Sequence, residues 1–258
     1  MITLTSAQLD GWIAMLIFPL ARILALIASA PITSSAQFPV RAKIGLAVML
    51  TVLLAPLLPA TEIISGSATS MLLLVREVLI GIAMGMAMRV VFAAVSMAGD
   101  VIGLQMGLGF AQFYDPQSSA HVPVTGQFLG LVATLIFLSL NGHLLLLSTL
   151  VESFQRAPAL AGAVPATNWL SLAQWGGMIM RAALLLSLPV IAVLLITNIT
   201  LAVLSKAATQ LNIFAIGFPI TLGVGFIAML ITLPTMSPAL TKLFSDALQV
   251  MLQVATIP

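Results

Sequence analysis

The sequence predicts an all-α membrane protein, and three observations carry this prediction. Of 258 residues, 61% are hydrophobic and only 6% are charged, against about 25% charged in ordinary soluble domains. The apolar residues gather in about six runs, which we count as candidate spans. A polar, glycine-rich stretch from Gly99 to Ser119 interrupts these runs in mid-chain. A soluble chain of this length has too little interior to bury so many apolar helices on all sides.

The charged and reactive residues are few. Nine Lys and Arg against seven Asp and Glu give a net charge of +2, which is not a basic surface for nucleic acid. Cysteine is absent, so disulfides, thiolate metal sites and cysteine nucleophiles are excluded. No nucleotide-binding, hydrolase or metalloprotease motif is present, and His121 and His143 lie in loop or turn sequence. We therefore expect no enzyme, no metal and no cofactor.

The first apolar run, Gly11 to Ala30, has the ~20 residues that a span needs. Its flanking sequence lacks the basic region of a cleaved signal peptide, so we expect a retained span. The run contains Arg22, which either packs inside an assembly or extends from a helix end toward water. The connector 31–43, with Arg41 and Lys43, is expected on the cytoplasmic side. A short second run, 44–58, follows it.

The next run, Met71 to Gly109, contains no proline. At ~1.5 Å per residue a continuous helix would reach about 58 Å, nearly twice the ~30 Å hydrocarbon core. The helix therefore either protrudes from the membrane or breaks. Its charged residues indicate that much of it never meets lipid; they are Arg76, Glu77, Arg89 and Asp100.

Glycines on this run share one helical face. Gly81 and Gly85 form a GxxxG pair, and Gly99, Gly103 and Gly107 continue near the same angle. Such a ridge favours close helix contact. The alternative is that these glycines are merely tolerated, because membrane helices are rich in glycine.

The second half of the chain is expected to hold three further runs. The run 124–147 contains Asn141-Gly142-His143, a candidate turn that would divide it. A polar connector is expected at 148–177, before a long run at 178–204. A polar break at 206–219 leads into the last strong run, 220–233, which Pro234 and Pro238 are expected to close. The tail 239–254 has a mildly amphipathic helical pattern.

Two functions remain open from the residues alone. A standalone secondary transporter would use polar breaks such as 103–119 and 206–219, although no repeated motif relates them. A subunit of a larger pore would use the glycines for packing, with the loop aromatics lining or obstructing a channel. The aromatics are Phe110, Phe113 and Tyr114, and Asp115-Pro116 closes the stretch with a turn signal.

Two motifs make the chain resemble the FliR/SctT family of type III export-gate subunits. The first is Gly107-Leu-Gly109-Phe110-Ala-Gln-Phe113-Tyr114-Asp115-Pro116, and the second is Gln210-Leu-Asn212-Ile-Phe214-Ala-Ile-Gly217-Phe-Pro219. The length, the run of spans, Arg22 and the Pro39-Val-Arg41 connector agree as well. The family usually has proline before the second motif, where this chain has Thr209.

The resemblance implies a non-enzymatic subunit of the flagellar gate or, alternatively, of an injectisome gate. It implies helical hairpins assembled with FliP and FliQ, beside FlhB, around a channel for unfolded export substrates. The location would be the bacterial inner membrane at the flagellar basal body, projecting toward the periplasm. Residues 1–147, with a plug loop at 107–119, would resemble FliP, and residues 178–258 would resemble FliQ.

The resemblance also assigns candidate residues. The plug would comprise Gly107, Gly109, Phe110, Phe113, Tyr114, Asp115 and Pro116, with Phe110 and Phe113 obstructing the channel and the glycines giving the backbone freedom. The alternative is that these aromatics only pack a re-entrant loop. Packing or gate contacts would be Arg22, Gly81, Gly85, Gly99, Gly103, Gln210, Asn212, Phe214, Gly217 and Pro219.

Overall fold

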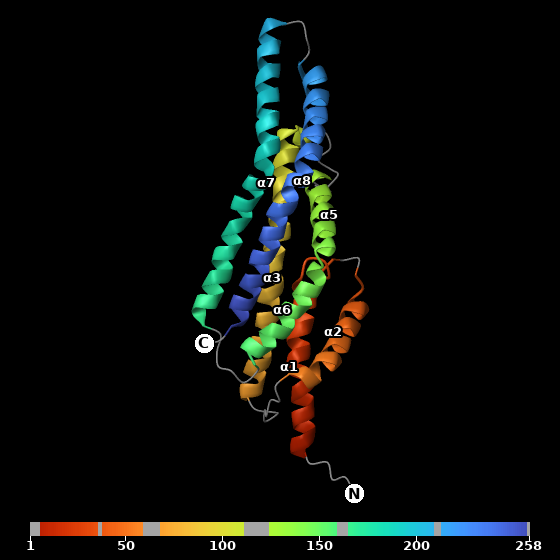
Figure 1. Ribbon diagram of the computed structural model, residues 1–258, viewed down its shortest axis with the longest axis vertical. Coiled ribbons are helices and arrows are strands. Elements are labelled where there is room, and N and C mark those ends of the chain that lie inside the picture. The colour runs from red at the N-terminus through yellow and green to blue at the C-terminus, as the bar shows by residue number, and fades with distance from the viewer. Residues whose placement is uncertain are drawn as a thin grey trace. The chain divides into compact units, whose positions relative to one another are not determined.

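The computed structural model describes residues 6–35, 38–58, 68–110, 124–158, 165–208 and 213–256. These ranges contain seven α-helices, two short 3-10 helices and no strand (Figure 1). The prediction of an all-α fold is therefore confirmed. The helices are α1 (Ser6–Ser29), α2 (Val40–Leu54), α3 (Ala68–Gln105), α5 (Val124–Ser139), α6 (Gly142–Arg156), α7 (Ala166–Ala207) and α8 (Ile213–Ala255), with η1 (Ala55–Leu57) and η2 (Leu108–Phe110) between them.

Three helices in the described ranges are long and apolar enough to cross a membrane. They are α3, α7 and α8, and α5 with α6 adds a fourth if that pair is one broken span. The expected number of about six spans is not confirmed. The two predicted runs that do not qualify are the first two, because the apolar part of α1 is Met15–Ser29 and α2 has 15 residues, both shorter than the ~20 residues that a span needs.

Helix α3 settles whether the proline-free run breaks. It is continuous over 38 residues, so it is about 57 Å long at ~1.5 Å per residue. At the usual membrane tilt of about 20° it is still longer than a ~30 Å hydrocarbon core. Part of α3 therefore lies outside the core, or is covered by protein, which fits its four charged residues.

The predicted turn in the run 124–147 is confirmed, since α5 ends at Ser139, α6 begins at Gly142 and Asn141 has a left-handed φ of 54°. The connector predicted at 148–177 is wrong. Helix α6 continues to Arg156, and α7 begins at Ala166. The polar residues that suggested a connector are one face of an amphipathic helix, because Leu150 and Phe154 are buried on the other.

The prolines near the C-terminus do not end a helix, contrary to the prediction. Helix α8 passes through Pro219, Pro234 and Pro238 and ends at Ala255. An interior proline costs about 3 kcal/mol, but a full break in apolar surroundings would leave more backbone groups without partners.

The chain divides into two compact units whose boundaries fall inside α3, α7 and α8. Unit 1 comprises residues 1–90, 141–176 and 244–258, and unit 2 comprises residues 91–140 and 177–243. In unit 1, α1 and α2 form an antiparallel hairpin (Figure 1), and Ile23, Leu26 and Ile80 are buried. In unit 2, the rings of Phe92 and Phe137 meet edge to face with centroids 6.1 Å apart.

Candidate functional site: a closed loop stem and a buried charge cluster

The candidate loop begins where α3 ends, in unit 2. The Met106 amide still donates to the Ile102 carbonyl at 2.9 Å, whereas the Gly107 amide donates to the Leu104 carbonyl at 3.1 Å. Gly107 then takes a φ of 88°, a conformation that side chains with a Cβ rarely adopt. This is the left-handed glycine that commonly terminates a helix. Gly107 therefore directs the chain out of α3 and into the short helix η2.

The residues on both sides of the loop pack directly on one another. A methyl group placed on Gly99 of α3 would lie 2.5 Å from the Cα atom of Gly126 in α5, and one placed on Gly103 would collide with the Thr125 hydroxyl. Only residues without a side chain permit such an approach. We call Gly99, Gly103, Thr125 and Gly126 the loop stem. The stem brings together the parts of α3 and α5 that flank the segment 107–123, and we call this contact the closed base of the loop.

Helix α8 supports the same end of α3 within unit 2. The Thr221 hydroxyl donates to the Met106 carbonyl at 3.2 Å. The Met106 side chain lies against Gly225, where an added methyl would be 2.6 Å from the Met106 Cγ atom. Met106 itself is fully buried. The start of the loop is therefore fixed from two sides, by α5 and by α8.

Asp100 lies at the loop stem. Its Oδ1 atom is buried beside Gly126 and has no hydrogen-bond partner in the described part of the chain. A side chain at position 126 would take the space of this oxygen. The glycine at 126 is thus required twice, for the approach of Gly99 and for the carboxylate of Asp100.

The structure describes only some residues of the two sequence motifs. Phe113, Tyr114, Asp115 and Pro116 lie outside the described residues, as do Gln210 and Asn212. Phe110 belongs to η2 and Phe214 to α8, but their side chains are outside the description. Gly109 is half-buried beside Leu104, Gly217 is buried and Pro219 is exposed.

A buried charge cluster lies in unit 1 around Arg22 of α1. Its Nε atom donates to Oε2 of Glu77 in α3 at 2.6 Å, and neither side chain is exposed. Its two terminal nitrogens donate to the Ser153 hydroxyl of α6 at 3.1 Å and to the Ala157 carbonyl at 2.8 Å. The guanidinium also lies 4.3 Å above the centre of the Phe154 ring, within the range of a cation–π contact.

A second arginine reaches the same end of α6. The Arg76 guanidinium of α3 donates to the Pro158 carbonyl at 3.3 Å. Carbonyls at a helix C-terminus lack intrahelical donors and carry the negative end of the helix dipole. Arg22 therefore satisfies the Ala157 carbonyl at the end of α6, and Arg76 adds a second positive charge just beyond it. The sequence predicted a contact role for Arg22 but did not identify Glu77, Ser153 or Arg76 as the neighbours of Arg22. The available signal was an arginine and a glutamate in separate apolar runs, which indicate a buried pair.

The other half of the glycine ridge packs against α1 beside this cluster. A methyl on Gly81 would lie 2.8 Å from the Ala25 side chain, and one on Gly85 would collide with Ser29. The Ser29 hydroxyl donates to the Ala25 carbonyl at 2.7 Å. The ridge on α3 thus contacts α1 in unit 1 and α5 in unit 2, with different glycines in each.

The site offers packing and hydrogen bonding. Within the described ranges, no group of three or more His, Asp or Glu side chains converges as a metal site would require. The described features are close helix crossings around glycine, a loop closed at its base and buried ion pairing.

The fold and these contacts define an all-helical membrane protein with one loop held by a glycine stem. A family model described as bacterial export proteins, family 1, matches residues 13–247, and the chain belongs to that family. It is 44% identical to the flagellar biosynthetic protein FliR of Escherichia coli K12 over 95% of this chain and 94% of the relative. It is 40% identical to the protein of the same name from Pectobacterium carotovorum over 99% and 98%. The Bacillus subtilis protein of that name is 30% identical over 89% and 90%.

Proposed function

We propose that the chain is a non-enzymatic core subunit of the flagellar type III protein export gate. The observation that carries this proposal is the similarity, over nearly the full length of both chains, to proteins named flagellar biosynthetic protein FliR. The chain would sit in the bacterial inner membrane at the flagellar basal body. It would form part of the channel for unfolded export substrates, together with FliP and FliQ and beside FlhB.

The surface of α7 and α8 supports a role inside an assembly. Both helices are rich in exposed aliphatic side chains along unit 2, such as Ile196, Val203, Leu230 and Ile231. Lipid can cover only the part at membrane depth, and helices of 42 and 43 residues are about 63 Å long at ~1.5 Å per residue. Other subunits covering the remainder would explain why so much apolar surface is tolerated.

The loop stem supports a plug in this channel. A loop closed at its base by Gly99, Gly103, Thr125 and Gly126 can carry Phe110 and Phe113 as a unit without disturbing the helices on either side. Apolar side chains in a narrow pore exclude water and ions by dewetting, and a passing polypeptide can displace them. Tyr114, Asp115 and Pro116 would complete the plug, while Gly107 supplies the turn that leads into it.

Purification in mild detergent tests the proposal. The tagged full chain is expressed with its natural neighbours, and the proteins that remain bound are identified by mass spectrometry. The proposal expects FliP and FliQ in a stable complex. It also expects the chain to restore motility and secretion of flagellar proteins in an Escherichia coli strain that lacks its own FliR. A lone monomer or homodimer that transports a small solute would overturn the gate assignment, and rescue of an injectisome instead of a flagellum would move it to that apparatus.

A further inference from the structure

Basic side chains lie at the turn between α1 and α2 in unit 1, and two of them contact it. Arg41 and Lys43 come from the start of α2, and Arg89 comes from α3. Arg41 and Arg89 are exposed, and Lys43 is half-buried. We call these three side chains, together with Ser34 and Ser35 of the turn, the basic turn.

The basic turn is built by contacts from two elements. An Arg89 nitrogen donates to the Ser34 hydroxyl at 3.2 Å, and the Lys43 amine donates to the carbonyl of the adjacent Ser35 at 3.4 Å. Two cations that are 46 positions apart in sequence therefore reach consecutive residues. Each keeps further N–H groups for another acceptor, because an ammonium has three donors and a guanidinium five.

No carboxylate neutralises this cluster within the described residues. The ion pairs there join Arg22 to Glu77 and Arg156 to Glu152, and neither involves Arg41, Lys43 or Arg89. Cations held near one another repel each other unless an anion or water screens them. The basic turn is thus an exposed positive site with hydroxyl groups at its centre.

An aliphatic surface on α2 adjoins the basic turn. One face of α2 packs on α1 through Ala47, Leu50 and Leu54. The opposite face is exposed, and beyond Arg41 in the first turn its large side chains are aliphatic or thioether: Val40, Ile44, Val48, Met49, Val52 and Leu53. Gly45 on this helix has open space where a side chain would stand. Arg41 and Lys43 belong to the first turn of α2, where the helix dipole is positive, and this turn has no side-chain cap.

We propose that the basic turn binds the phosphate of an anionic phospholipid whose acyl chains lie along the exposed face of α2. Basic residues at the end of an apolar helix attract anionic headgroups, and aliphatic side chains match acyl chains. Helix α2, with 15 residues, is about 22 Å long at ~1.5 Å per residue, which is too short to cross the core but long enough to line one leaflet. The occupant is a lipid because the cations lie at one end of the aliphatic face, as a charged headgroup lies at one end of its acyl chains. The proposal rests on the membrane character of the fold and not on the export function.

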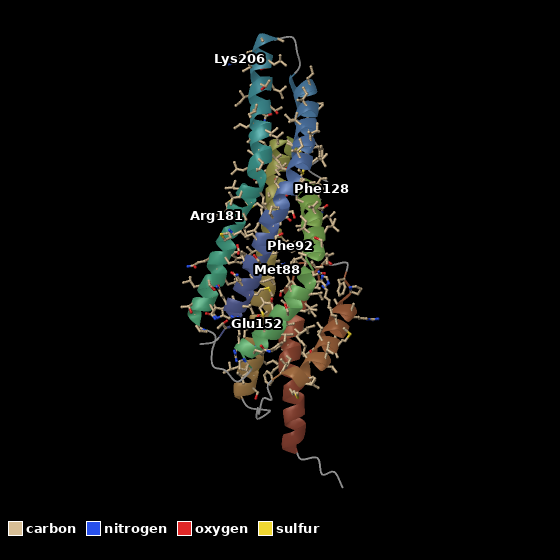
Figure 2. The ribbon with its side chains drawn as sticks, viewed as in Figure 1. Met88, Phe92, Phe128, Glu152, Arg181 and Lys206 are labelled. Carbon is tan, nitrogen blue, oxygen red and sulfur yellow. The ribbon has the colours of Figure 1, made fainter. Side chains whose placement is uncertain are left out.

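The test uses the full-length chain purified in detergent and titrated with labelled phosphatidylglycerol and phosphatidylcholine. The variant R41Q/K43Q removes two charges of the basic turn and should weaken phosphatidylglycerol binding roughly 25-fold, or about fivefold for each charge. Phosphatidylcholine binding should change little. The matched control R181Q/K206Q removes two exposed charges from α7, far from α2 in sequence (Figure 2), and should retain the phosphatidylglycerol affinity.

Further variants distinguish the loss of charge from the change of side chain. R41K/K43R preserves both charges and should bind phosphatidylglycerol as the parent does, whereas R89Q alone should lose about fivefold. The lipid assignment is overturned if R41Q/K43Q keeps the parent preference for phosphatidylglycerol, or if R181Q/K206Q loses it equally. Displacement of the lipid by inorganic phosphate at comparable concentration would point to a free anion instead. Loss of a bound protein subunit with unchanged lipid affinity would identify a protein surface.

Discussion

Arg22 and Glu77 form an ion pair with no exposed surface, with Nε 2.6 Å from Oε2. The chain offers a second pair at the same distance, since Arg156 and Glu152 on α6 approach to 2.6 Å with their side chains 46% and 43% exposed. Figure 2 labels Glu152 on its helix. The two pairs share this shortest N–O distance and differ in burial, so comparing variants of the two pairs tests the effect of burial.

Replacing Glu77 by Gln should destabilise the protein strongly. The change leaves the buried Arg22 charge without its carboxylate, and removing one partner of a buried pair typically costs about 3–5 kcal/mol. The matched change E152Q breaks the exposed pair and should cost less than about 1 kcal/mol. Thermal unfolding of both variants in the same detergent measures the difference.

A double variant distinguishes charge from packing at this cluster. R22M/E77L removes both charges and keeps apolar volume, so it should recover much of the stability lost in E77Q. If E77Q and E152Q unfold at the same temperature, the buried pair contributes no more than the surface pair, and the account of the cluster fails.

Alanine at Gly99 should disrupt the loop stem. The added methyl would lie 2.5 Å from the Cα of Gly126, so α3 and α5 must separate, at a cost of about 1–3 kcal/mol. The control G223A adds the same methyl to α8, where nothing lies within 4 Å, and alanine is favoured over glycine in a helix by about 1 kcal/mol. Unfolding temperatures should therefore fall for G99A and hold or rise for G223A. Equal effects of the two changes would mean that the stem is not a close contact.

Cysteines placed at Gly103 and Thr125 should form a disulfide across the stem. A Cβ built on Gly103 lies 3.5 Å from the Thr125 Cβ, at the lower end of the ~3.5–4.5 Å range found in disulfides. The chain has no cysteine of its own, so oxidation of G103C/T125C reports on this pair alone. Mass spectrometry after mild oxidation should show an internal cross-link, and the single variants G103C and T125C should show none. A pair that stays reduced would place α3 and α5 farther apart than the stem requires.

The disulfide in G103C/T125C also tests which part of the loop moves during export. If the plug opens by displacement of its tip, the cross-linked protein should still support export in the motility assay. Loss of export that returns on reduction would instead show that α3 and α5 must separate at Gly99 and Gly126 for the channel to open.

Some of these features can be predicted from the sequence because they depend on the residues of one helix. Others depend on tertiary contacts and cannot. Periodic glycines on α3 predict close contact because only small residues allow it, but the partner helices depend on which runs the fold brings together. Hydropathy does not predict the second half of α6, because Glu152 and Arg156 make this amphipathic helix look like a polar connector. Local proline rules fail at α8, where the surroundings outweigh the loss of a hydrogen bond at Pro234. Arg22 stands out in an apolar run, whereas its bond to the Ala157 carbonyl follows only from tertiary structure.

Replacing Trp175 should separate a hydrogen bond from ring packing in unit 1. The Trp175 indole of α7 is buried and donates to the Ala87 carbonyl of α3 at 2.8 Å. W175F should cost about 1 kcal/mol for the bond, plus a smaller term for lost volume, and W175A about 3–5 kcal/mol. W169F, at a half-buried position on the same helix, is the control and should have less effect than W175F. The opposite order in thermal unfolding would mean that the indole bond does not hold α7 to α3.

Truncating Phe110 and Phe113 should raise the ion conductance of the assembled gate. The proposed plug excludes ions because its apolar rings leave no room for hydrated cations, and F110A/F113A removes both rings without touching the stem. The control F128A truncates an exposed ring on α5 in the same unit (Figure 2). Conductance is measured across planar bilayers that contain the purified complex, after the subunits of each variant complex are shown to match the parent. A leak in F110A/F113A but not in F128A supports the plug. Unchanged conductance in a correctly assembled complex would leave the two rings with a packing role, and the loop stem would then serve to fix the helices rather than to carry a gate.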